Sequence, residues 1–208
     1  MSESVQAVDP AVSRVKYERE VADFCELSAE YGRRGWFLVE ATFPQILVVM
    51  GVPQVRPAAL LCGVLLDYSD YDLRPPSVRF VDPFTREPYS AAELPTRLLR
   101  QTEIDAPPGF PLPPGQVPAR MVQQQPLIMD YEDAGSDEPP FLCVAGVREY
   151  HEHSAHSGDP WELHRGAGAG RLVRLLEVVD TYGVRPINGF AVNLVPQIGG
   201  FTQGQVPS

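Results

Sequence analysis

A single helical pattern followed directly by strand-like runs is the feature that most constrains the fold of this chain. Apolar side chains recur at helical spacing over residues 10–31. Three runs rich in β-branched, aromatic and other apolar residues follow at 36–43, 46–50 and 58–66, and residues 74–83 place two prolines before a short fourth run. Because no helical pattern separates these runs, helices and strands are expected to segregate. We therefore expect an α+β fold with an N-terminal helix on a four-stranded antiparallel meander.

The helical pattern is expected to begin at Pro10, where a helix tolerates a missing donor, and to end at Gly32. It carries Cys25 on its apolar side, and Cys62 lies within the third strand-like run. We interpret both as small core residues. With Cys143 the chain has three cysteines, and this odd, widely spaced set does not indicate a disulfide framework.

Between residues 83 and 140 prolines are frequent and periodicity is weak. Within this insert, 94–104 is expected to form a short helix and 126–131 a further strand. The prolines of 106–118 exclude a helix there. This proline-rich stretch either wraps over the sheet and covers one edge, or serves as a ligand of the SH3 type.

The length of 208 residues indicates one domain. We place that domain at 1–186, with the insert inside it, and a C-terminal tail at 187–208. The last expected element is an amphipathic helix from about 172 to 179, ended by Gly183 and Pro186.

The charge balance limits the classes of partner. With 17 basic and 27 acidic residues the formal net charge is −10, which disfavours binding to a phosphate backbone, so no nucleic-acid partner is expected. The longest apolar run, 58–66, is far shorter than the roughly 20 residues that cross a bilayer. The N-terminus lacks the basic and apolar regions of a secretory signal. We therefore expect a cytoplasmic protein with no membrane partner.

All four histidines lie between positions 151 and 164. On an extended segment His151 and His153 would project to one face, and a turn could bring His156 round to complete a set of three. Three imidazoles with one open position are typical of catalytic zinc, and a fourth protein ligand would close the site. We thus predict zinc bound by His151, His153 and His156. Candidates for the fourth ligand are Cys143, His164, Glu152 and Asp159.

The alternative is a polar loop whose histidines hydrogen-bond neighbouring carboxylates. Within the zinc prediction itself, His164 lies beyond Pro160 and Trp161 and is the weaker ligand candidate; we expect it to orient a carboxylate instead. Cys143 also leaves two interpretations open. It ends an apolar run just before a glycine turn and the histidine cluster, so a neighbouring imidazolium or metal would make its thiolate available. Otherwise it is a buried strand cysteine.

Several of these segments resemble ubiquitin-conjugating (E2) domains. Residues 71–80, which read Tyr-Asp-Leu-Arg-Pro-Pro-Ser-Val-Arg-Phe, resemble the Tyr-Pro-x-x-Pro-Pro-x-Val-x-Phe segment that follows the third strand of those domains. Residues 141–143 resemble the stretch that carries the thioester cysteine, Trp161 resembles the tryptophan that follows, and the helix from Arg171 resembles the long helix beneath. The resemblance covers roughly residues 10 to 182, and implies that Cys143 is the nucleophile.

The chain also departs from the eukaryotic pattern. The histidine-proline-asparagine motif, whose asparagine assists transfer, is missing before Cys143, and the stretch from Pro76 to Cys143 is longer than usual. The histidine cluster is similar to that of a bacterial group of E2-like proteins with the pattern Tyr-His-Glu-His-x-x-His-Ser-Gly-Asp-x-Trp. That resemblance implies metal binding, a bacterial origin and a place beside ubiquitin-like conjugation genes.

Three functions follow as hypotheses. The first is an E2-like, metal-binding component of a bacterial ubiquitin-like conjugation system, with a structural or adapter role. The second is an active E2-type transferase that carries a ubiquitin-like protein as a thioester on Cys143, received from its activating enzyme. The third is a non-catalytic protein-interaction module, since fold analogy alone does not choose between them.

Overall fold

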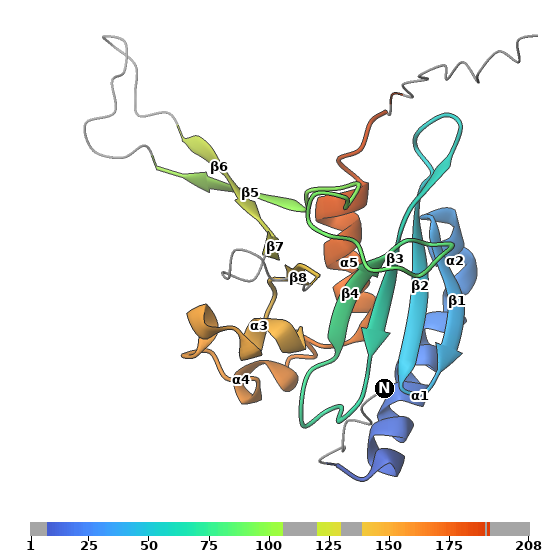
Figure 1. Cartoon of the computed structure of the whole chain (residues 1–208), viewed down its shortest axis with the longest axis vertical. Helices are drawn as coiled ribbons and strands as arrows, with labels where there is room; N and C mark the ends of the chain where they lie inside the picture. Colours follow the sequence, from blue (N-terminus) through green and yellow to red (C-terminus); the bar gives the residue numbers. More distant parts are fainter. Residues whose placement is uncertain (1–7, 106–119, 130–138, 190, 192–208) are drawn as a thin grey trace, which may run out of the picture.

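The computed structural model describes residues 8–105, 120–129, 139–189 and 191. It is an α+β fold in which a four-stranded antiparallel sheet lies against helices from both ends of the chain (Figure 1). The N-terminal helices are α1 (Pro10–Glu26) and α2 (Ser28–Arg33), and the C-terminal helix is α5 (Leu172–Val179). Helices α1 and α5 contact each other against the sheet.

The sheet is the meander that the sequence predicts. Its strands lie in chain order and pair antiparallel: β1 (Trp36–Thr42), β2 (Gln45–Val52), β3 (Ala59–Asp67) and β4 (Ser77–Val81). Alternate residues of the strands point at the helices, as the period of two requires. These buried positions include Ile46, Val48, Met50, Cys62, Val64, Leu66, Val78 and Phe80.

The helical side of the core is formed by α1, α2 and α5. Tyr17 and Phe24 of α1 and Leu172 and Leu176 of α5 are buried in the same apolar cluster as the strand residues. The α5 helix repeats buried side chains at helical spacing and continues into a π-helical turn, Asp180–Val184. The predicted C-terminal helix is confirmed.

Two details of the first helix differ from expectation. The helix breaks at Leu27, and α2 continues through Gly32 to Arg33, so the predicted end at Gly32 is wrong. The turn into β1 is made at Gly35, whose φ of 87° suits glycine. Cys25 is exposed, which corrects its assignment to the core, because the buried face of α1 runs through Tyr17, Glu20 and Phe24 instead. Cys62 is buried as predicted.

The first residues of the insert fold back on the sheet. Val81, at the end of β4, forms an isolated antiparallel bridge with Pro88. Arg86 Nη1 donates a hydrogen bond to Glu40 Oε2 of β1 at 2.6 Å. The start of the insert therefore covers the free edge at the end of β4 and reaches across to β1.

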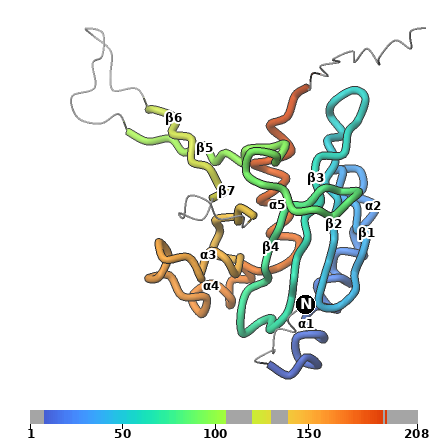
Figure 2. Tube along the Cα trace, in the orientation of Figure 1, coloured from blue at the N-terminus to red at the C-terminus, as the bar shows by residue number. Residues whose placement is uncertain are grey.

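Two described strands of the insert form a projecting arm. Strands β5 (Leu99–Ile104) and β6 (Met121–Pro126) pair as a two-stranded antiparallel sheet that extends away from the body (Figure 2). The predicted helix over 94–104 is wrong, because its second half pairs with a strand that follows only after the proline-rich stretch. Within the expected strand 126–131, β7 (Ile128–Met129) pairs with β8 (Phe141–Leu142), and residues 130–131 lie outside the described residues. The stretch 106–118 and most of the predicted tail 187–208 lie outside the described residues.

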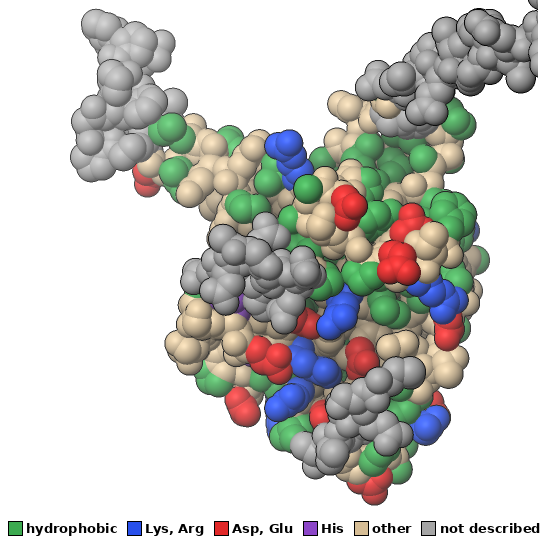
Figure 3. All heavy atoms as spheres, viewed as in Figure 1, with side chains coloured by type: hydrophobic (Ala, Val, Ile, Leu, Met, Phe, Trp, Pro, Cys, Tyr) green, Lys and Arg blue, Asp and Glu red, His purple; other side chains and the backbone are tan. Residues whose placement is uncertain are grey.

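No helix among the described residues is long and apolar enough to span a bilayer. On the face shown in Figure 3, basic and acidic side chains are interspersed, so that face carries no large patch of one sign.

Candidate functional site

The histidine segment is helical where an extended chain was expected. Helix α3 (Arg148–Glu152) contains His151, a 3₁₀ turn spans Ser154–His156, and the short helix α4 (Glu162–Arg165) contains His164. The expectation that two of these histidines project from one extended face is therefore wrong. Side chains two residues apart on a helix point in different directions.

This segment is fastened to the Pro-Pro segment that precedes β4. Arg148 Nη2 donates to the carbonyl of Ser69 at 2.6 Å, and the Ser77 hydroxyl donates to the carboxylate of Glu149. Trp161 Nε1 donates to the carbonyl of Asp72 at 3.1 Å. Two segments that are far apart in the sequence thereby form one surface beside β8.

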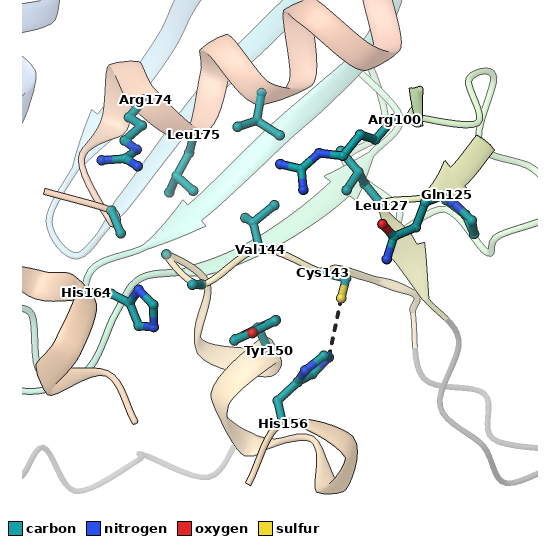
Figure 4. A pocket seen from close by; sticks show the side chains of 15 residues that line it. Arg100, Gln125, Leu127, Cys143, Val144, Tyr150, His156, His164, Arg174 and Leu175 are labelled. Carbon is teal, nitrogen blue, oxygen red and sulfur yellow. Dashed lines mark hydrogen bonds between the residues drawn. The ribbon is translucent and has the colours of Figure 1, made fainter. Parts of the chain in front are cut away.

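A pocket of about 410 Å³ opens between this segment, α5 and the root of the β5–β6 arm (Figure 4). Its floor is partly apolar, and its polar side chains come from six separate elements and from the turn after β8. They include Arg100, Gln125, Cys143, Tyr150, His156 and Arg174.

Cys143 lies directly after β8 and is half-buried in this pocket. Figure 4 shows its sulfur directed at His156, and Cys143 Sγ lies 3.4 Å from His156 Nε2. Burial raises the pKa of the Cys143 thiol, an effect that Arg100 partly offsets. Burial and the neighbouring His153 lower the pKa of His156. Both shifts favour the neutral pair, in which the thiol can donate its hydrogen to Nε2 when the ring proton of His156 lies on Nδ1.

Neighbouring side chains hold the ring of His156 in place. It stacks on Tyr150, with 3.9 Å between ring centroids and 19° between planes. The Tyr150 hydroxyl donates to Asp159 Oδ2 at 2.7 Å, and His164 Nε2 lies 2.6 Å from Asp159 Oδ1. Burial, with the hydrogen bond to Asp159 next, raises the pKa of Tyr150 to about 12. The bonds from His164 and Tyr150 lower the pKa of Asp159. The alternative reading of His164, as a residue that contacts a carboxylate, agrees with this geometry.

The three histidines predicted as zinc ligands do not converge. His151 Nδ1 lies 2.8 Å from the carbonyl of Asp159, and its Nε2 lies 2.7 Å from the carbonyl of Ala145. Both of its nitrogens are therefore engaged away from Cys143. His153 is buried beside Phe141, and its Nδ1 accepts a hydrogen bond from Ala155 N.

Among the residues that the structure describes, no group of three or more His, Cys, Asp or Glu side chains is arranged to hold a metal ion. As they lie here, the predicted ligands do not fit a tetrahedral zinc site. The zinc site stays a prediction.

Sequence reasoning singled out Cys143 and His156, and the structure brings them together. It did not find Arg100, Gln125 or Arg174, which also line the pocket. Arg100 and Gln125 stand opposite each other in the β5–β6 pairing, inside an insert without periodicity. No local signal marks them. Tyr150 and Asp159 belong to the motif of the bacterial resemblance and could have been found through it.

A sequence model described as Y4jH-like, of the Y4jH family, matches residues 8–187 of the chain. The chain is also similar to the uncharacterized protein y4jH of Sinorhizobium fredii (strain NBRC 101917 / NGR234). The two are 41% identical over 198 residues, and the match covers 94% of each.

Proposed function

The chain belongs to the Y4jH-like family, and we propose that it is an E2-type transferase carrying a ubiquitin-like protein as a thioester on Cys143. The observation that carries this proposal is the contact between Cys143 Sγ and His156 Nε2 at 3.4 Å in an open pocket. A thiol with a neutral imidazole in reach is the arrangement that nucleophilic thiol catalysis needs.

The first step uses the neutral pair. As the sulfur attacks the thioester carbonyl delivered by the activating enzyme, His156 Nε2 takes the thiol proton. A tetrahedral intermediate forms and collapses, and the carbon–sulfur bond to the activating enzyme's cysteine breaks. His156 returns the proton to that leaving sulfur. The ubiquitin-like protein is then bound to Cys143, and His156 is neutral again.

The second step transfers the acyl group to an amine or hydroxyl acceptor. The acceptor attacks the thioester carbonyl, and the Cys143 sulfur leaves and recovers a proton. The oxyanion of this intermediate needs a hydrogen-bond donor. The asparagine that assists this step in ubiquitin-conjugating enzymes is absent before Cys143. Among the described lining residues Gln125 carries a side-chain amide, and we assign it this stabilising role.

The order of elements supports the same proposal. An N-terminal helix, a four-stranded meander, a Pro-Pro segment after the third strand and a C-terminal helix are the order that the resemblance implies. The cysteine follows the meander and comes directly after β8, a strand that contacts β4. Trp161 contacts the segment 71–80 through the carbonyl of Asp72.

The test is thioester formation with purified components. The protein, its activating enzyme, ATP and the ubiquitin-like protein are mixed, and intact mass is measured before and after reduction. A reducible adduct is expected for wild type and for Cys25→Ala, the exposed cysteine control, and is lost in Cys143→Ala. An adduct that persists in Cys143→Ala contradicts the proposal. Absence of any adduct in wild type favours a non-catalytic interaction module.

Zinc binding is the second candidate, and it rests on one pair of ligands, because no group of three lies together among the described residues. Sulfur and nitrogen ligands on one tetrahedral zinc ion lie about 3.6 Å apart, close to the observed Cys143–His156 distance. Metal content by mass spectrometry of wild type and His156→Ala tests it. About one equivalent of zinc in wild type, lost in the variant, supports this role. Metal-free wild-type protein contradicts it.

A further inference from the structure

We propose that the Cys143 pocket binds a carboxylate of the substrate through Arg100 of β5 and Arg174 of α5. The claim that the transfer substrate carries this carboxylate rests on the proposed function. The claim that the pocket binds an anion beside Cys143 can be tested independently of it.

The first observation is the sign of the pocket. The described residues that line it include two arginines and no aspartate or glutamate. This is notable in a chain with 27 acidic residues against 17 basic ones, whose net charge is −10. A pocket whose formal charges are all positive attracts an anionic group and repels the ammonium of a lysine side chain.

The second observation is that neither guanidinium is paired with a carboxylate of the described residues. Within the described part of the chain Arg100 makes no hydrogen bond or ion pair, and its guanidinium lies 5.7 Å from the centroid of the Tyr182 ring. Arg174 donates through Nη1 to the carbonyl of Ala167 at 2.8 Å and has no acidic partner there. Five other arginines, by contrast, are each paired with a carboxylate: Arg34, Arg86, Arg120, Arg171 and Arg185.

The third observation is the setting of these charges. Figure 4 shows Arg100 and Arg174 entering from β5 and α5, with the apolar side chain of Leu175 nearby and Cys143 and His156 on the opposite wall. Both arginines are exposed side chains at the rim of the pocket, so their attraction for an anion acts through partly open solvent and weakens as salt is added. A guanidinium also offers paired donors whose geometry matches a carboxylate.

The test compares two alkylating agents of the same size. Iodoacetate is an anion and iodoacetamide is neutral. With each, a bond forms between Cys143 sulfur and carbon, iodide leaves, and the thiol proton passes to His156. The measured quantity is the ratio of the iodoacetate rate to the iodoacetamide rate at Cys143, resolved by peptide mass spectrometry. Using the ratio cancels any effect of Arg100 on the thiol itself, since that effect is common to both reagents.

The ratio at Cys143 is expected to fall roughly tenfold in Arg100→Gln and in Arg174→Gln, and to recover largely in Arg100→Lys. Arg120→Gln is the matched control. It removes a positive charge from the arm at the residue just before β6. Arg120 is exposed there and paired with Glu103. Cys25 on α1 serves as an internal control whose ratio stays constant. Equal ratios at Cys143 in wild type and both glutamine variants overturn the proposal, whether or not a thioester forms.

A second pair of assays identifies which substrate brings the carboxylate. Loaded protein is discharged with cysteine or with cysteamine, which differ only by a carboxylate. Loading is also compared for donor peptide thioesters ending in Glu-Gly or Gln-Gly. A preference for cysteine places the carboxylate on the acceptor, and a preference for Glu-Gly places it on the donor tail. No preference in either assay, with a loaded thioester present, contradicts the substrate assignment.

Discussion

At the residue scale, the proposed reaction depends on a thiol and an imidazole whose pKa shifts both favour the neutral form. The pKa of Cys143 is raised by burial, and that of His156 is lowered by burial and by His153. Such a pair reacts by proton transfer during attack, whereas a preformed thiolate would react without a base. Its reactivity should therefore depend on the imidazole as well as on the thiol.

Replacing His156 by glutamine should slow alkylation of Cys143 by iodoacetamide about a hundredfold at pH 7. In wild type the pKa of His156 is lowered from its ordinary 6.5. The alkylation rate should therefore fall only when the pH drops below 6.5, as the imidazole becomes protonated. In the variant the rate should instead rise only as the thiol itself ionises, at a pH above the ordinary 9.0. The measurement is a rate–pH profile from pH 5 to 10. An unchanged rate at pH 7, with Cys25 as the internal reference, contradicts the role of His156 as base.

At the scale of elements, the turn after β8 depends on a close approach of two backbones. A Cβ on Gly146 would overlap the carbonyl of Ala169, in the segment that leads into α5. This approach fixes the distance between the Cys143 turn and α5, which are opposite sides of the pocket.

Gly146→Ala should lower the free energy of unfolding by about 2 kcal/mol or more, because the backbone has to move apart. Gly166→Ala is the matched control. A Cβ there meets nothing within 4 Å, and the substitution should be neutral or slightly stabilising. Urea denaturation of both variants measures the difference. Equal stabilities would show that the turn relaxes without cost.

The contact between α1 and α5 contains a buried carboxyl group. Glu20 of α1 is 1% exposed, and its Oε2 accepts a hydrogen bond from Leu172 N at the start of α5. Burial raises its pKa, although the bond from Leu172 and the charge of Arg171 partly offset this. A raised pKa in the folded state means that protonation favours folding. The stabilisation is complete below the ordinary pKa of 4.5 and is lost as the pH rises through the folded value.

Wild type should therefore gain stability relative to Glu20→Gln when the pH is lowered from 7 to 4. The glutamine keeps an oxygen acceptor for Leu172 N and removes the buried charge. Urea unfolding of both proteins at the two pH values gives the difference. If wild type instead loses stability relative to the variant at pH 4, Glu20 behaves as an ordinary ion-paired carboxylate and the prediction is wrong.

At the scale of the whole molecule, one polar network ties the start of the sheet to the end of α5 and the π-helical turn that follows it. Arg34 donates to Glu177 Oε1 at 2.6 Å and to Asp180 Oδ2 at 2.8 Å. Trp36 Nε1 donates to Asp180 Oδ1 at 3.2 Å, and Arg185 Nε donates to Asp180 Oδ2 at 2.7 Å. Asp180 is 3% exposed, so its charge depends on these donors.

Arg34→Ala should destabilise the fold by about 3 kcal/mol, because it leaves a buried carboxylate short of its partners. Arg86→Ala removes an ion pair with Glu40 whose side chains are 56% and 37% exposed, and it should cost less than about 1 kcal/mol. Thermal or urea unfolding distinguishes the two. Similar losses in both variants would contradict the importance of burial at Asp180.

Much of the fold could be predicted from local patterns. Runs such as 46–50 and 58–66 are apolar enough to become strands, and residues 172–179 repeat apolar side chains at helical spacing; both patterns reflect burial within one element. The errors arose where burial or pairing depended on distant residues. Cys25 fits the helical spacing, but the tilt of α1 on the sheet buries a different face. Residues 99–104 become a strand because residues 121–126 lie beside them.

The sequence by itself determined the α+β class, the antiparallel meander and the C-terminal helix, and it singled out Cys143 and His156 as candidate site residues. Only the tertiary structure decided which side chains meet at the pocket. Arg100, Gln125 and Arg174 reach it from the arm and from α5, and His151 is turned to backbone carbonyls rather than to Cys143. The physical reason is that periodicity reports how a segment divides between core and solvent, whereas a pocket forms where separate elements happen to be packed. Their relative placement depends on the whole set of nonlocal contacts, which no single stretch of sequence encodes.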